Sequence, residues 1–129
     1  MHSPSRKLNP SARPSVMKTL EKVKAQVEFD KFADLMWKRV DPLYNELCLI
    51  ISEALILNPD SLVKLNGEMI YVGLVQEVFA QLRNEHLRLV FNNFQYVSYH
   101  VYNKKAYLRT ALYNVFFEIE SHHGGLGYY

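Results

Sequence analysis

The sequence of 129 residues offers little for covalent or metal-based stabilisation. Cys48 is the only cysteine, which excludes an internal disulfide and a cysteine-based zinc site. There are only five glycines and five prolines, and three of the prolines fall within the first 14 residues. A single free cysteine fits a reducing compartment, so we expect a cytoplasmic protein.

Long apolar runs are also absent. The first 30 residues contain no hydrophobic segment of the kind found in secretory signals. The most apolar run extends from Leu47 to Leu57, includes Ser52 and Glu53, and is shorter than the ~20 residues that span a bilayer. The sequence therefore predicts no association with a membrane.

Motifs for catalysis are missing as well. The chain has no Ser/His/Asp set, nucleophile elbow, glycine-rich phosphate loop or dinucleotide fingerprint. His122 and His123 lie in a glycine-rich tail, and His86 and His100 stand apart. Cys48 has apolar neighbours at helical spacing, which favours an inert buried thiol over a nucleophile. We therefore expect no enzymatic activity, no cofactor and no metal.

The net charge of +2 combines two regions of opposite sign. Residues 1–24 hold six basic residues and one acidic residue, whereas the remainder holds nine basic and twelve acidic residues. A net acidic body argues against a uniformly basic nucleic-acid-binding domain. The basic N-terminal segment still allows non-specific contact with DNA phosphates, through Arg6, Lys7 and Arg13.

Three regions differ in composition. Residues 1–14 are rich in Ser, Pro and Arg and have almost nothing apolar to bury, so we expect a disordered leader. Residues 15–120 carry the apolar periodicity of a single helical domain. Residues 121–129 include three glycines and are expected to form a flexible tail.

Helical periodicity runs through most of the domain. Asp41 followed by Pro42 is a typical helix start, and apolar residues at helical spacing continue to Leu55. We expect this to be the central core helix, with Ser52 and Glu53 on its polar face. Asn84 and Asn103 are expected to cap later helices. Further helices are expected at residues 15–36, 69–82 (with Tyr71 and Leu74 on the buried face), 85–95 and 104–120.

Two segments depart from this pattern. Ser61 to Glu68 is expected to be a short extended piece that ends in an Asn66-Gly67 turn. Residues 96–102 alternate with a period of two, which favours a strand, but no partner strand is evident, so we expect an ordered aromatic connection. The predicted fold is all-α, a compact bundle of about five helices with one short extended segment near residues 62–70.

Helix 85–95 carries side chains that could read DNA bases. Its polar side offers Arg88, Asn92, Asn93 and Gln95, and Arg, Asn and Gln pair bidentately with base edges. Together with helix 69–82 it imitates a helix-turn-helix. The net acidic body and the absence of glycine from the intervening turn argue against this interpretation.

The final helix carries a second candidate surface. Cations interleaved with tyrosines suit single-stranded nucleic acid or a protein partner, through phosphate attraction and stacking. The alternative is that the tyrosines pack inward and the cations only solubilise the helix. The residues proposed to contact a partner or nucleic acid are Lys104, Lys105, Tyr107, Arg109 and Tyr113.

Six segments occur in a recognisable order, at residues 23–30, 43–55, 65–70, 75–82, 84–87 and 102–114. The last, Tyr102-Asn-Lys-Lys-Ala-Tyr-Leu-Arg-Thr-Ala-Leu-Tyr-Asn114, is the closest match. In this order the chain resembles the C-terminal domain of the replication initiator A family, from plasmids and conjugative elements of Gram-positive bacteria. That domain is similar to DnaD primosomal domains, so the resemblance implies a DnaD-like helical fold.

The chain also departs from this family. Members usually carry an origin-binding winged-helix domain, which has no counterpart here, and Val115-Phe-Phe117 replaces their usual Ala-Pro. The resemblance therefore implies the recruiting half of initiation, through protein contacts with host primase or helicase loader. One alternative is a DNA-binding protein of a mobile element that uses the basic leader or helix 85–95. Another is self-association into a homo-oligomer.

Overall fold

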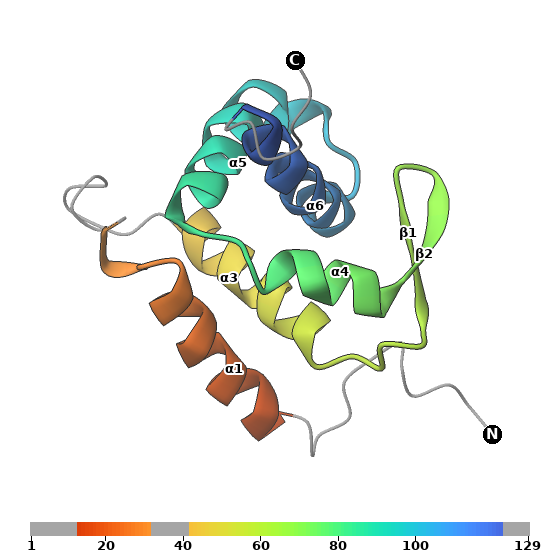
Figure 1. Cartoon of the computed structure of the whole chain (residues 1–129). Helices are drawn as coiled ribbons and strands as arrows, with labels where there is room; N and C mark the ends of the chain where they lie inside the picture. The colour runs from red at the N-terminus through yellow and green to blue at the C-terminus, as the bar shows by residue number, and fades with distance from the viewer. Residues whose placement is uncertain (1–12, 32–41, 123–129) are drawn as a thin grey trace.

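The computed structural model describes residues 13–31 and 42–122 (Figure 1). Within these residues the chain is mostly helical and has one small two-stranded sheet, which confirms the expected all-α bundle of about five helices. The elements are α1 (Arg13–Gln26), α3 (Pro42–Leu55), β1 (Leu62–Leu65), β2 (Glu68–Tyr71), α4 (Val72–Phe79), α5 (Asn84–Val97), the short 3-10 turn η3 (Ser98–His100) and α6 (Lys104–His122).

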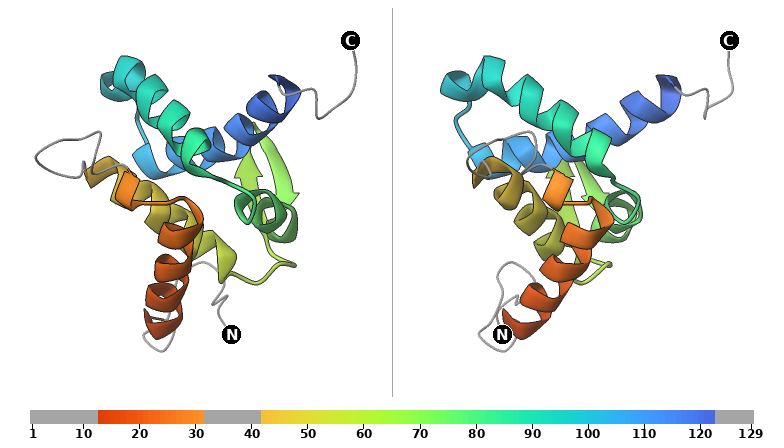
Figure 2. Two further views of the ribbon diagram at one scale, coloured as in Figure 1. Left: turned by 60° about the vertical axis from the view of Figure 1, so that its left-hand side comes forward. Right: turned by 90° about the vertical axis from the view of Figure 1, so that its left-hand side faces the viewer.

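Helix α3 is the central element, as expected. It contacts α1, α4, α5 and α6, and in Figure 2 α1 lies on one side of it and the α5–α6 pair on the other. Pro42 is its first residue, and Leu47, Cys48 and Ile51 on its apolar face are completely buried. Burial raises the pKa of the Cys48 thiol to about 12, so the thiol stays protonated and unreactive.

Ser52 corrects one expectation about this helix. It was predicted to lie on the polar face, but its side chain is fully buried. Its hydroxyl donates a hydrogen bond of 2.8 Å to the carbonyl of Cys48, one turn earlier. Because this bond satisfies the hydroxyl within the helix, a serine can occupy the core at little cost.

Glutamine and asparagine side chains donate hydrogen bonds to backbone carbonyls at the C-terminal ends of neighbouring helices. Gln76 of α4 donates to three carbonyls at the end of α3, at 2.9 to 3.3 Å. Gln26 donates to the carbonyl of Phe79, the last residue of α4, at 3.1 Å and to that of Leu82 beyond it at 2.7 Å. Asn84, which was expected to cap its own helix, instead donates to the carbonyl of Val27 beyond α1, and Arg83 occupies the N-cap position of α5. These bonds fix the mutual positions of α1, α3, α4 and α5.

The expected extended segment is one strand of a β-hairpin. Strands β1 and β2 pair antiparallel with Leu65 opposite Glu68, which leaves Asn66 and Gly67 as a two-residue turn. Both turn residues have positive φ, 54° and 80°, as a type I′ turn requires. The Asn66 amide exchanges two hydrogen bonds with Asn114 of α6, at 2.9 and 3.1 Å, and thus ties the hairpin tip to α6.

The helix expected at residues 69–82 is therefore partly wrong. Its first residues form β2, and α4 begins only at Val72. Tyr71 and Leu74, expected on the buried face, are 58% and 51% exposed. The Asn66-Gly67 turn explains the difference, because it pairs the residues that follow it with β1 before a helix can start.

The boundaries of α5 and α6 agree more closely with the expectations, whereas the helix expected at residues 15–36 ends at Gln26 and a turn with a positive φ of 54° at Glu28 follows it. Helix α5 ends at Val97 and is followed by η3 and a short connection, and residues 96–102 form no strand. Asn103 caps α6, since its side-chain oxygen accepts a hydrogen bond of 3.0 Å from the Ala106 amide. Helix α1 begins at Arg13, within the range expected to be disordered.

Some expectations lie outside the described residues. These are the leader up to residue 12, with Arg6 and Lys7, the Asp41 cap and the tail from residue 123. No helix in the described ranges has the length and apolar character that crossing a membrane requires.

Candidate interaction surface on α5 and α6

The two lysines predicted to contact a partner are engaged with α3. Lys104 Nζ lies 2.9 Å from Glu46 Oε1, and Lys105 Nζ lies 2.7 Å from Glu53 Oε1. Both lysines are exposed, and such ion pairs contribute about 0–1 kcal/mol to stability. Their charge is largely matched by the glutamates, so these lysines offer a partner less positive charge than the sequence indicates.

Arg109 is half-buried one turn further along α6. Its Nε atom is buried and has no hydrogen-bond partner. Burial lowers the pKa of Arg109, and the charge of Glu53 opposes that shift. The side chain therefore serves the α6–α3 packing more than an outer contact surface.

The tyrosines predicted on α6 also point largely inward. Tyr107 is half-buried and its ring lies 5.8 Å from that of Phe94 on α5. Tyr113 is half-buried with its ring 5.4 Å from Phe117. For these two side chains, the alternative of inward packing describes the structure better than a stacking surface does.

The exposed aromatic residues lie instead between α5 and α6. Tyr96, in the last turn of α5, is 78% exposed, Tyr99 in η3 is 80% exposed, and Tyr102 before α6 is fully exposed. We call these three residues the tyrosine cluster. The alternating pattern of residues 96–102 was a partial signal, because Val97 and Val101 pack on the core and Tyr96 and Tyr102 lie outside. It did not predict the exposure of Tyr99, which falls in the same register as the two valines.

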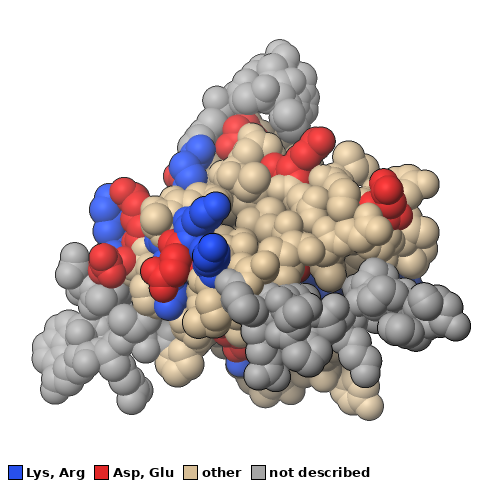
Figure 3. All heavy atoms as spheres, turned by 90° about the horizontal axis from the view of Figure 1, so that it is seen from below, with Lys and Arg blue, Asp and Glu red and all other residues tan. Residues whose placement is uncertain are grey.

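The stretch of sequence around the tyrosine cluster has no acidic residue, although Glu46 and Glu53 of α3 lie beside Lys104 and Lys105. From His86 to Phe117 the chain has no Asp or Glu. The four basic residues in this stretch are Arg88, Lys104, Lys105 and Arg109. On the face drawn in Figure 3, acidic and basic side chains are intermixed, and much of the described surface carries neither. This face therefore offers no broad patch of one sign.

The base-reading side chains expected on helix 85–95 are partly engaged within α5. Arg88 is half-buried and its Nε donates to the side-chain oxygen of Asn84. Gln95 donates to the carbonyl of Phe91 at 3.1 Å. Asn92 and Asn93 are exposed. Two amides without a projecting arginine make a weak surface for reading base pairs.

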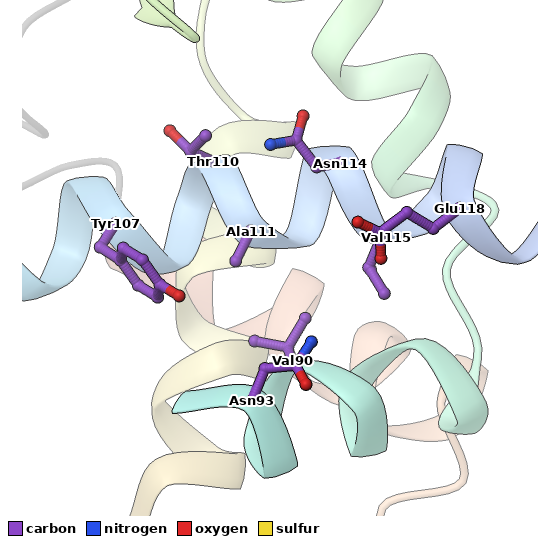
Figure 4. Close-up of a pocket in the computed structure, with 8 residues that line it drawn as sticks. All are labelled: Val90, Asn93, Tyr107, Thr110, Ala111, Asn114, Val115 and Glu118. Atoms are coloured by element: carbon purple, nitrogen blue, oxygen red, sulfur yellow. The ribbon is translucent and has the colours of Figure 1, made fainter. Parts of the chain in front are cut away.

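A groove with a volume of about 180 Å³ lies between α5 and α6 (Figure 4). Val90 of α5 faces Ala111 and Val115 of α6 across it, and Tyr107 and Glu118 stand at its two ends. We call it the α5–α6 groove. Its lining consists of Val90, Asn93, Tyr107, Thr110, Ala111, Asn114, Val115 and Glu118.

His86 lies in the interior near the Glu118 end of α6. Its side chain is fully buried and stacks on Phe116, with 5.7 Å between ring centroids. Its Nδ1 accepts a hydrogen bond of 2.8 Å from the Arg83 amide, which requires a neutral ring with the proton on Nε2. Nε2 has no partner. Burial lowers the pKa of His86, and the charge of Arg83 lowers it further.

We expect the free energy of unfolding to fall as the pH drops from 7 to 5. The pKa of His86 is lower in the folded chain than the ordinary value of about 6.5, so the unfolded chain binds more protons below that pH. The stabilisation is complete above pH ~6.5 and is lost toward the lower, folded-state pKa. One such group changes stability by at most about 1.4 kcal/mol per pH unit. Urea unfolding at several pH values between 7.5 and 5 measures how steeply the free energy of unfolding changes with pH.

A His86→Gln variant provides the comparison. Glutamine at this position keeps an acceptor for the Arg83 amide, as in a capping box, but does not titrate. The slope between pH 7 and 5 should be smaller in this variant, whereas His100→Gln at an exposed position should leave it unchanged. An equal slope in His86→Gln and the native chain would assign the pH dependence to other groups.

The chain was also compared with known proteins. No family model matches it, and no curated protein or solved structure does so either. Within the described ranges, no three His, Cys, Asp or Glu side chains come together in a way that could hold a metal ion. The function must therefore be argued from the surface itself.

Proposed function

We propose that this chain is a non-enzymatic interaction module of DNA replication initiation that binds other replication proteins in the cytoplasm. The tyrosine cluster carries this proposal. Three exposed tyrosines lie within seven consecutive residues, in a stretch that has no acidic side chain. A partner protein would bind this cluster and the adjoining α5–α6 groove.

Tyrosine suits protein contacts for physical reasons. Its ring buries a large area at a low cost in conformational entropy, and its hydroxyl can bond at the edge of an interface. The central parts of protein interfaces are enriched in tyrosine and depleted in charge. Tyr96, Tyr99 and Tyr102 expose aromatic rings without charge, as the centre of an interface requires. The charges of Lys104 and Lys105 beside them are already paired with glutamates.

The link to replication comes from the resemblance to the replication initiator A family. The closest matching segment runs from Tyr102 to Asn114. It begins in the tyrosine cluster and ends at the residue that ties the hairpin to α6. A module of a plasmid or other mobile element that recruits host primase or helicase loader would need such a contact surface.

Binding of the purified chain to the primase and the helicase loader of a Gram-positive host tests the proposal. Calorimetric titration should give a dissociation constant of about 10 μM or lower for one of them. If neither protein binds at ~10 μM, the recruiting function is wrong. Light scattering of the chain alone shows in the same samples whether self-association accounts for its behaviour.

DNA binding is a second candidate, favoured by the acid-free stretch from His86 to Phe117 and by exposed Asn92 and Asn93. Titrations with single- and double-stranded DNA at several salt concentrations test it, because phosphate contacts give a steep salt dependence. Removing residues 1–12 leaves α1 in place and tests the basic leader. Salt-dependent binding that this truncation abolishes would assign the contact to the leader, whereas unchanged binding would assign it to the body.

A further inference from the structure

The α5–α6 groove has a chemical character of its own. Its floor is apolar, formed by Val90, Ala111 and Val115. Its polar groups include the Glu118 carboxylate and the Tyr107 hydroxyl, at opposite ends in Figure 4. A carboxylate and a hydroxyl oxygen accept hydrogen bonds, and no cationic side chain lines the groove. The amides and hydroxyls of the lining can both donate and accept hydrogen bonds, so Glu118 alone sets the charge of the groove. Its carboxylate favours a ligand that is positively charged and donates hydrogen bonds.

Glu118 contributes a negative charge to the groove that no cationic side chain neutralises. Other glutamates that contact α6 or lie on it form ion pairs. Glu46 and Glu53 pair with lysines, and Glu120 lies 3.9 Å from Arg83. Among the described residues, the Glu118 side chain forms no ion pair or hydrogen bond. In Figure 4 its side chain turns back along α6, so that the carboxylate lies near Val115 over the groove.

We propose that the α5–α6 groove binds an arginine side chain of the partner protein, with the guanidinium on Glu118. This inference rests on the proposed function and specifies the chemistry of the partner. A volume of about 180 Å³ is below the ~300–1,000 Å³ of sites for drug-sized ligands and suits a single long side chain. The aliphatic stem would cover Ala111 and Val115, as such stems do on apolar surfaces.

Arginine fits the groove better than lysine does. The guanidinium presents five donors in a rigid plane, so it can bond the Glu118 carboxylate with two parallel hydrogen bonds. A lysine ammonium has three donors at one point and holds its hydration more strongly. Arginine is also enriched, with tyrosine, among the residues that dominate protein interfaces.

One member of the tyrosine cluster, Tyr96, lies beside the groove. Asn93, which lines the groove, precedes Tyr96 by three residues, so the two side chains lie on the same face of α5. One partner segment can therefore place an arginine in the groove and apolar groups on Tyr96.

Titration of the whole chain with N-acetyl-arginine amide tests this inference by NMR. Single side chains bind weakly, so we expect saturable shifts of the backbone amides of residues 107–118 at millimolar probe. N-acetyl-citrulline amide has nearly the same shape but no charge, and it should shift these amides at least about fivefold less at the same concentration. No shifts at 10 mM, or equal shifts with the citrulline probe, would overturn the proposal.

A Glu118→Gln variant assigns the contact to the carboxylate. Its arginine-dependent shifts should fall at least about fivefold, whereas Glu77→Gln, an exposed site on α4 outside the groove, should behave like the native chain. Unchanged shifts in Glu118→Gln would also overturn the proposal. Both positions are exposed, and circular dichroism verifies that both variants fold. Binding of primase or loader without any arginine effect would leave the proposed function standing and refute only the arginine site.

Discussion

Replacing Tyr96 and Tyr99 together by alanine should weaken binding to the replication partner by about 30-fold or more. Tyrosines at the centre of an interface often contribute 2 kcal/mol or more, and 1.4 kcal/mol corresponds to a tenfold change in affinity. Tyr96 and Tyr99 are 78% and 80% exposed, so little of their area is already used by the fold. Calorimetric titration against the primase or loader that binds the native chain measures the change.

Tyr71→Ala is the matched control for this experiment. Tyr71 is also a large exposed aromatic residue, at 58%, but it lies at the end of β2 and outside the tyrosine cluster. Its removal should leave the affinity unchanged within about twofold. All the variants should unfold within about 0.5 kcal/mol of the native chain, because surface substitutions of this kind have small effects. Equal losses in the Tyr71 and the Tyr96/Tyr99 variants would show that the cluster is not the contact site.

Replacing Gln76 by alanine should lower the free energy of unfolding by about 2–3 kcal/mol. The Gln76 amide donates to the carbonyls of Ala54 and Leu55 at the end of α3 and of Leu57 just beyond it. Of these, the Ala54 carbonyl also accepts a bond of 3.3 Å from the Leu57 amide, whereas helix ends leave carbonyls without a partner in the next turn. A net hydrogen bond contributes about 1 kcal/mol, and a buried carbonyl left unpaired costs about 1–3 kcal/mol. The change is large beside a total stability of about 5–15 kcal/mol.

Gln81→Ala is the control that separates the loss of the Gln76 hydrogen bonds to α3 from the general effect of removing a glutamine side chain. Gln81 lies just after α4, is exposed, and donates only to the carbonyl of Glu77, at 3.0 Å. We expect its replacement to change stability by less than about 0.5 kcal/mol. Urea unfolding of both variants at pH 7 gives the comparison. Similar values for the two variants would mean that water replaces the Gln76 amide at the end of α3.

The elements that could be predicted are those whose cause lies within a few residues. Pro42 starts α3 because it loses no hydrogen bond at the first helical position. The Asn66-Gly67 turn follows from the tolerance of these residues for positive φ. The Asn103 cap is local as well, since the bond joins residues three apart.

The composition of the candidate site could not be predicted in the same way. The cations at Lys104 and Lys105 were visible in the sequence, but the glutamates that pair with them lie about 50 residues earlier, on α3. Asn84 was expected to cap its own helix, and its amide instead binds a carbonyl 57 residues away. A local pattern has no information on such partners, because they depend on how the helices are placed.

By itself, the sequence determined that the chain forms a helical bundle around α3, that α3 begins at Pro42 and α6 just after Asn103, and that a turn lies at Asn66-Gly67. These features depend on periodicity and on backbone preferences, which act over a few residues. Only the tertiary structure decided which tyrosines remain exposed, which lysines are paired, and that α5 and α6 enclose a groove ending at Glu118. Those properties arise from packing between helices, where contact and exposure depend on residues far apart in the chain.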